Sequence, residues 1–196
     1  MFEVLRAYFE SRMPITDEIF AVIRSLFQPR TLQKGDFLLR EGEVATHGYF
    51  VTKGCLRNYV IDNKGKEHIV QFAPENWWMT NLESISKGTP SLYFIDAIED
   101  TDVLMMSKSS FDRLLHGIPG FSTAFQMGIQ KSGAAKEKRI IASLSATAEE
   151  RYNDFLATYP SIALRVPQHM LASYLGITPE TVSRIRKKQS VKKQLY

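Results

Sequence analysis

Residues 166–188 read VPQHMLASYLGITPETVSRIRKK, and this stretch decides how the rest of the chain is interpreted. Its apolar residues recur at spacings that let two short crossing helices share one interior. They are Leu171, Leu175, Ile177, Val182 and Ile185. Gly176 falls between the helices, where a turn needs the positive φ that glycine adopts without steric cost. The pattern predicts a helix-turn-helix.

The starts of both helices are marked. Pro167 and Pro179 each suit a first helical position, because proline there loses no intrahelical hydrogen bond. Thr178 is the expected N-cap of the second helix. In a helix-turn-helix the N-terminal part of the second helix enters the major groove of DNA.

The outer face of the second helix has side chains suited to that groove. Arginine can read a guanine edge with two hydrogen bonds, and glutamate can accept one from cytosine. The candidate DNA-binding residues are Gln168, His169, Thr178, Pro179, Glu180, Thr181, Ser183, Arg184 and Lys187. The alternative is an ordinary helical hairpin with a solvated charged face.

The net charge of +4 is unevenly distributed. Six of the 25 basic residues and no acid lie within 184–196, which leaves 19 basic against 21 acidic residues in the body. A basic end on a mildly acidic body is the distribution expected of a protein that binds a polyanion there. The alternatives are a tail that only improves solubility, and one that binds an acidic partner or a membrane.

Composition limits the class of protein. The 196 residues suffice for one large domain or two small ones, with an ordinary apolar content of 44%. A single cysteine, Cys55, excludes a disulfide framework and a four-cysteine iron–sulfur cluster. No stretch approaches the roughly 20 apolar residues of a membrane span. We therefore expect a cytoplasmic protein with no membrane association.

The chain begins with helices and continues with strands. Residues 1–28 have helical periodicity, interrupted at Met13-Pro14, with a new start at Thr16 and an end at Pro29. Between residues 31 and 107, turn signals separate short runs rich in β-branched and aromatic residues. The runs are Phe37–Arg40, Gly48–Val51, Leu56–Ile61, His68–Phe72, Tyr93–Ala97 and Val103–Met106. This spacing predicts a small barrel or jelly roll enclosing one small ligand.

A helical region follows the strands. Residues 109–116 predict a short helix capped by Ser109 or Ser110, and a long helix then runs to about Leu144. The middle of the long helix has unusually small residues, namely Gly128, Ser132, Gly133, Ala134 and Ala135. Small residues allow close approach, so we predict a symmetric dimer seam here; the alternative is packing on the chain's own barrel. Thr147 and Glu150 fit a capping box that starts another helix, which Pro160 ends.

The expected fold is α+β. It has an N-terminal double-stranded, jelly-roll-like β-roll with flanking helices (1–117), a long dimerisation helix (118–145) and a C-terminal helix-turn-helix domain (146–196). The remaining QSVKKQLY leaves no room for the strand pair of a full wing, so the helix either runs on or gives way to a disordered tail that contacts backbone phosphate.

Three motifs extend the interpretation to most of the chain. LGITPETVSRIRKK (175–188), LQKGDFLLREGE (32–43) and NKGKEHIVQF (63–72) resemble the Crp–Fnr family of bacterial transcription regulators. The resemblance implies a homodimer, joined along the long helix, that reads a palindromic operator. It also implies base contacts from Glu180 and Arg184, and phosphate contacts from Thr181 and Ser183. Pro179 stands where some members have an arginine.

The ligand motif of the family is not matched. Members that respond to cyclic AMP have Gly-Glu-Leu followed by Arg-Ser, where this chain has Thr80-Asn81-Leu82 and Ser91-Leu92. A buried phosphodiester without a cation is costly, and Lys87 is the only basic residue between Asn76 and Ser107. We therefore expect little or no binding of cyclic AMP.

Two possibilities are left for the roll. Its aromatic residues favour an interior filled by side chains, and its polar residues favour a site for another small ligand. The candidate ligand-binding residues are Asn81, Glu83, Ser84, Ser91 and Tyr93.

An enzyme is the competing hypothesis. A metal-dependent cupin uses the same kind of roll but needs clustered histidines, and His47, His68, His116 and His169 are scattered. The sequence indicates no catalytic residue, metal ligand, haem ligand or other cofactor. Cys55 begins a strand and suits a core position better than a redox switch. The favoured prediction is a sequence-specific DNA-binding transcription regulator, gated by a small ligand other than cyclic AMP or by none. The alternative is a cupin-like protein with a basic interaction tail.

Overall fold

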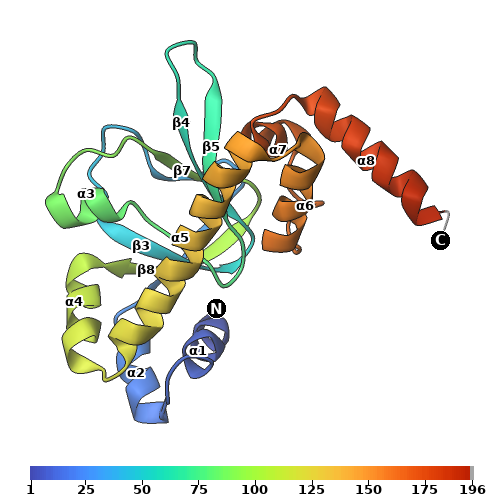
Figure 1. Ribbon diagram of the computed structural model, residues 1–196. Helices are drawn as coiled ribbons and strands as arrows, with labels where there is room; N and C mark the ends of the chain where they lie inside the picture. Colours follow the sequence, from blue (N-terminus) through green and yellow to red (C-terminus); the bar gives the residue numbers. More distant parts are fainter. Residues whose placement is uncertain (195–196) are drawn as a thin grey trace.

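The computed structural model describes the backbone of residues 1–194 and the side chains of residues 1–190. The part of the basic tail beyond these limits lies outside the described residues, and with it the predicted phosphate contacts of the tail. Figure 1 shows a β-roll, with helices at its base, a long helix crossing it and a helical domain at the far end. The final helix projects away from the body.

The roll consists of two antiparallel four-stranded sheets. The first has the order β1 (Gln28–Leu32), β8 (Thr101–Ser107), β3 (His47–Lys53) and β6 (Trp78–Met79). The second has the order β2 (Phe37–Leu39), β7 (Phe94–Ala97), β4 (Leu56–Ile61) and β5 (Glu67–Ala73). The six predicted runs are all strands, which confirms the predicted roll. Sequence reasoning missed β6 and β1; β1 contains Pro29, which an edge strand tolerates.

Helices cover the outer face of the first sheet. Side chains of α1 (Phe2–Glu10), α2 (Asp17–Ser25) and α4 (Lys108–Gly117) form one apolar cluster with Phe50, Leu104 and Met106 of the strands. The N-cap of α4 is Ser107, whose Oγ accepts from the Ser110 backbone N–H at 3.1 Å, so the prediction of Ser109 or Ser110 was wrong. The cap was missed because Ser107 is also the last residue of strand β8.

The helical domain packs directly on the second sheet. Tyr159 follows α6 (Ala148–Thr158) and contacts the Phe72 ring of β5 edge to face. Tyr174 of α7 (Gln168–Leu175) contacts the same ring in a tilted arrangement. Phe155 of α6 meets the same ring. One continuous apolar core therefore extends from the roll into the helical domain.

The long helix α5 (Phe121–Ser145) connects these regions. Gly128 faces Tyr8, where a Cβ would come within 2.6 Å of the hydroxyl oxygen, and Ala135 packs against the core. Both small residues therefore accommodate the chain's own side chains, as the packing alternative predicted. The outer face instead exposes larger apolar residues: Met127, Ile129, Ile140, Ile141 and Leu144.

Candidate DNA-binding surface and ligand cavity

The predicted helix-turn-helix is present in α7 and α8 (Pro179–Gln194). Gly176 has φ of 65° at the turn, and Leu171 and Val182 are completely buried between the helices. Pro179 is the first residue of α8, as predicted. Pro167 is the N-cap of α7 with an extended ψ of 142°, rather than its first residue.

The first turn of α8 is held by two side chains. Thr178 Oγ1 accepts a hydrogen bond from the Thr181 backbone N–H at 3.3 Å, which confirms the predicted N-cap. Gln168 Nε2 donates to the Pro179 carbonyl oxygen and so connects the start of α7 to the start of α8. Both contacts orient the end of α8 that a major groove would receive.

One face of α8 gathers most of the predicted DNA-binding residues. Glu180, Ser183, Arg184 and Lys187 follow helical spacing and are exposed; with Gln168 and Pro179 they line an open hollow on the surface. His169 is exposed outside this hollow, and Thr181 is half-buried. The pKa of Glu180 is lowered by its own backbone N–H and by the Thr178 hydroxyl, so its carboxylate is an acceptor at neutral pH.

Hydrogen-bonding capacity on this face is unused. Within the described residues, Ser183, Arg184 and Lys187 have no hydrogen bond or ion pair with another side chain. Arg186, on the opposite face, donates to the Tyr152 hydroxyl at 3.2 Å and to the Ala163 carbonyl at 3.1 Å. Sequence reasoning did not distinguish Arg186 from the exposed cations, although its position four residues after buried Val182 indicates the inner face.

The position of the helix-turn-helix is fixed by polar contacts with the roll. Ser173 Oγ accepts from the Ile69 backbone N–H at 3.1 Å and donates to the Glu67 carbonyl at 2.8 Å, so α7 covers the outer edge of β5. Arg165 pairs with Glu75, at 2.8 Å, and with Glu99. Sequence reasoning missed these contacts, because they join residues far apart in the chain.

The predicted ligand-binding residues bond to one another or to nearby groups, and none of them lines the cavity described next. Asn81 is the N-cap of α3 (Leu82–Lys87), and its Nδ2 donates to Ser91 Oγ at 2.9 Å. Ser84 Oγ accepts from the Ala45 backbone N–H and donates to the Thr89 carbonyl. Ser91 Oγ also accepts from the Tyr93 N–H, while exposed Glu83 pairs with Lys87. These contacts stabilise α3 and the segment after it.

The structure places a different cavity beside them. About 360 Å³ is enclosed between the roll, α3, α4 and α5, with a mainly apolar lining that includes Trp78, Ile85, Phe111 and Phe125. The polar atoms come mostly from residues that sequence reasoning did not select: Gln71, Thr80, Ser86, Ser107, Asp112 and Ser132, with Lys108 and Lys136 as the cations. Only the small side chains in the middle of α5 hinted that space would be left here.

Within the part of the chain that is described, no three His, Cys, Asp or Glu side chains are placed to hold a metal ion. His68 is half-exposed at the β4–β5 turn, where its Nε2 lies 2.8 Å from Asp62. Likewise, no helix within residues 1–194 is long and apolar enough to cross a membrane.

Known proteins share this order of elements. Residues 29–117 match the family model of the cyclic nucleotide-binding domain. The probable transcriptional regulator flp of Lacticaseibacillus casei is 25% identical, over 91% of this chain and 84% of its own length. The transcriptional activator protein Anr of Pseudomonas protegens is 24% identical, over 80% of this chain and 68% of its own. The names of both relatives describe regulators of transcription.

A solved structure shows the same fold over most of the chain. FixK2 from Bradyrhizobium japonicum superposes with a TM-score of 0.72 at 22% identity, covering 85% of each chain. The roll, the long helix and the helix-turn-helix follow one another in the order that the sequence motifs predicted. The chain is therefore similar, in sequence and in fold, to bacterial transcription regulators of the Crp–Fnr family, and this similarity supports a DNA-binding transcription regulator.

Proposed function

We propose that the protein binds DNA as a homodimer and that each subunit places α8 in the major groove of one half of a palindromic operator. The observation that carries the proposal is the exposed, unpaired face of α8 formed by Ser183, Arg184 and Lys187. In this proposal Glu180 and Arg184 contact base edges, whereas Thr181 and Ser183 contact phosphates. Such a regulator acts in the cytoplasm, where bacterial DNA lies.

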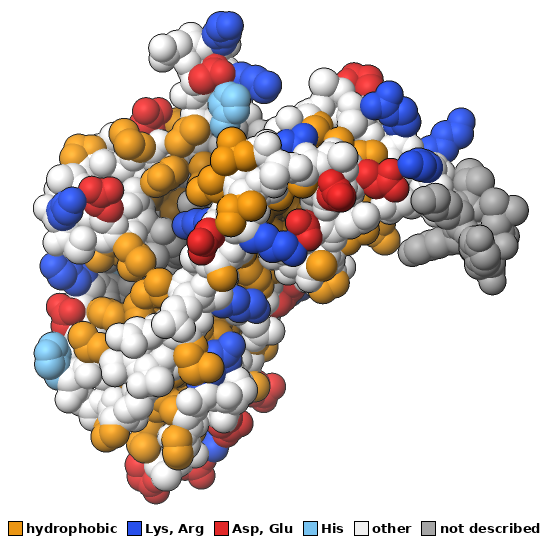
Figure 2. Space-filling model, in the orientation of Figure 1, with side chains coloured by type: hydrophobic (Ala, Val, Ile, Leu, Met, Phe, Trp, Pro, Cys, Tyr) orange, Lys and Arg blue, Asp and Glu red, His pale blue; other side chains and the backbone are white. Residues whose placement is uncertain are grey.

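The proposed dimer seam is the outer face of α5. Ile140, Ile141 and Leu144 are 61%, 57% and 84% exposed and lie within two turns of one helix. Figure 2 shows hydrophobic side chains at the surface along this helix, beside lysines and arginines. A run of exposed apolar side chains is a common sign of a protein interface. The second copy would pack here and set the two α8 helices about one DNA turn apart.

In this proposal each of three consecutive parts of the chain has a separate role. Residues 1–117 would sense, 118–145 would join the subunits, and 146–196 would bind DNA. The cavity between α3 and α5 supports an effector with a mainly apolar body, because most of its lining is apolar and α5 forms one wall. We do not expect cyclic AMP there, because the chain has Ser91-Leu92 where responsive members of the family have Arg-Ser; the cations of the cavity are Lys108 and Lys136 instead.

A salt series tests the proposed function. Binding to random-sequence duplex DNA is measured by fluorescence anisotropy between low and moderate salt, with the stoichiometry read from sedimentation. We expect a steep loss of affinity with salt and two protein chains for each duplex site. Absence of DNA binding at low salt would contradict the proposal. Leu144→Asp is expected to shift the sedimentation toward the monomer, and Val22→Asp, at an exposed position in α2, is the matched control.

A further inference from the structure

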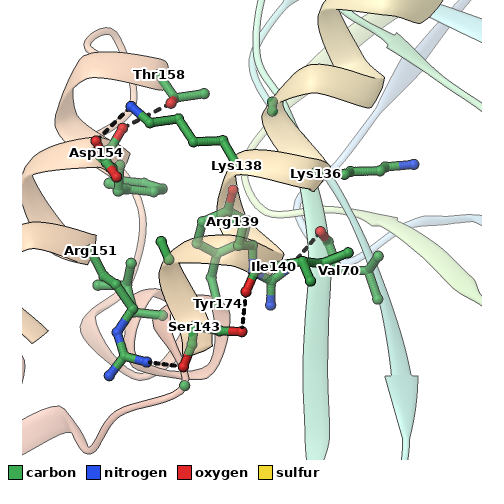
Figure 3. A pocket seen from close by; sticks show the side chains of 15 residues that line it. Val70, Lys136, Lys138, Arg139, Ile140, Ser143, Arg151, Asp154, Thr158 and Tyr174 are labelled. Atoms are coloured by element: carbon green, nitrogen blue, oxygen red, sulfur yellow. Dashed lines mark hydrogen bonds and ion pairs between the residues drawn. The ribbon is translucent and has the colours of Figure 1, made fainter. Parts of the chain in front are cut away.

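A second cavity lies where three parts of the protein meet. It encloses about 340 Å³ between the C-terminal half of α5, helices α6 and α7, and strand β5. Figure 3 shows it from close by, with Arg139 and Lys138 entering from α5 and Arg151 and Asp154 from α6. We call it the hinge pocket. Its volume is at the lower end of the range for small-molecule sites and far too small for duplex DNA.

Positive charge in the hinge pocket exceeds negative charge. Four cations line it, namely Lys136, Lys138, Arg139 and Arg151, against one acid, Asp154. The acid is already paired, because Lys138 Nζ lies 2.6 Å from its Oδ1. Three cations thus lack a carboxylate partner within residues 1–190.

Arg139 is the most confined of these cations. Its guanidinium donates to the carbonyl oxygens of Ile69 and Val70, at 2.8 and 2.7 Å, and lies 4.1 Å from the centre of the Tyr174 ring. Burial lowers its pKa, and only tyrosines act against that shift. A cation held by neutral groups in a partly dry site favours an incoming anion.

Arg151 leaves a donor unused. Its Nε is buried without a hydrogen-bond partner among the described residues, and its other contact is a long one, 3.5 Å from Nη1 to the Ser143 carbonyl oxygen. A buried donor without a partner is unfavourable unless a ligand or water supplies the acceptor. Apolar walls from Phe155, Leu175 and Ile140 complete the pocket.

From the geometry we infer that the hinge pocket binds a small organic anion. Its oxyanion group would accept hydrogen bonds from Arg151 and neutralise Arg139, while its apolar or aromatic body would lie against Phe155 and Tyr174. This site is separate from the apolar cavity beside α3; Lys136 alone lines both.

The location gives the ligand a means of regulation. An occupant would contact the long helix, the helix-turn-helix domain and the edge of the roll at once, and would favour the arrangement in which they are packed together. The affinity for DNA would then depend on the anion. This consequence rests on the proposed function, whereas binding of the anion does not.

A fluorescent aromatic anion tests the site without DNA. The full-length protein is titrated with anilinonaphthalene sulfonate, and the dissociation constant is compared among wild type, Arg151→Gln and Lys108→Gln. Arg151→Gln removes the unpaired donor of the hinge pocket, and Lys108→Gln removes a cation from the other cavity. For Arg151→Gln we expect a dissociation constant at least about tenfold higher than that of the wild type, because a charged hydrogen bond is lost. For Lys108→Gln we expect no change in the dissociation constant.

Every other outcome overturns the inference. A loss confined to Lys108→Gln places the anion beside α3, and equal behaviour of both variants means that only apolar surface or general charge attracts it. Circular dichroism shows whether Arg151→Gln folds. Arg151→Lys serves as a second variant, which is expected to retain part of the affinity because it keeps the charge. Since no DNA is present, failure here is distinguishable from failure of DNA binding.

Discussion

The β-roll and helix α8 use polar side chains in opposite ways. In the roll, Arg57 is buried and donates to both carboxylate oxygens of Asp96, at 2.7 and 2.9 Å, and also bonds to Glu67. On α8, Arg184 is exposed and has no partner among the described residues. An arginine side chain therefore stabilises the fold in one region and is available to a ligand in the other.

This difference separates structural residues from site residues. Asn81, Ser84 and Ser91 were predicted to bind a ligand because they are polar and lie in the segment where cyclic-AMP-responsive members of the family have their ligand motif. In the structure they bond to each other and to nearby backbone groups. Residue type alone did not reveal this. A polar group indicates a site when its hydrogen-bonding capacity remains free, as on α8 and at Arg151.

The largest expected effect is at Arg57. Arg57→Met leaves the Asp96 carboxylate, only 6% exposed, without its partner, and should lower the free energy of unfolding by about 3–5 kcal/mol. Urea unfolding followed by circular dichroism measures the change. The double variant Arg57→Met with Asp96→Leu should recover most of it. A loss below about 1 kcal/mol, typical of a surface ion pair, would show that the two regions do not differ as described.

An intermediate effect is expected at Arg184, on DNA affinity and not on stability. Arg184→Ala should weaken binding to the true operator by about 1–3 kcal/mol and relax the preference at one base pair. The thermal midpoint should not change, because the side chain has no partner in the protein. Anisotropy on operator and random duplexes measures both effects.

The matched control for Arg184 is Lys187→Ala. It should weaken binding on all sequences alike and reduce the salt slope by about 1, as expected for a phosphate contact. If Arg184→Ala behaved in this way too, Arg184 would contact phosphate rather than a base.

The smallest expected effect is at Asn81. Asn81→Ala removes the Oδ1 that accepts from the Ser84 N–H at 3.1 Å, and loss of such an N-cap destabilises by about 1 kcal/mol. Asn81→Asp keeps the acceptor and should lose less. Thermal unfolding compares the two. Unchanged stability in Asn81→Ala, together with an altered response to an effector, would restore Asn81 as a ligand-binding residue.

The small residues of α5 and its exposed apolar residues are not equivalent as tests of the dimer seam. Ala135 lies among the small residues, but its side chain packs against the protein's own core. A bulky residue there would disturb folding as well as any dimer. Leu144, 84% exposed, is the position that tests the seam by itself.

Local patterns predicted much of the structure correctly. Gly176, Pro179 and the capping box of Thr147 with Glu150 were identified correctly because glycine, proline and capping side chains act within a few residues of their own position. The strand runs followed from alternation and turn signals in the same way. The boundary errors at Ser107 and Pro167 amount to one to three residues, and Ser107 is both the last residue of β8 and the N-cap of α4.

The sequence by itself therefore determined the order of most elements, the helix-turn-helix and the exposed polar face of α8. Only the tertiary structure decided which polar groups were already paired, as in the Asn81–Ser91 contact, and which were left free, as at Arg151. It also decided where cavities formed, because residues from α5, α6, α7 and β5 meet there only after folding. The physical reason is that periodicity and capping depend on near neighbours, whereas burial, pairing and enclosed volume depend on contacts between distant segments.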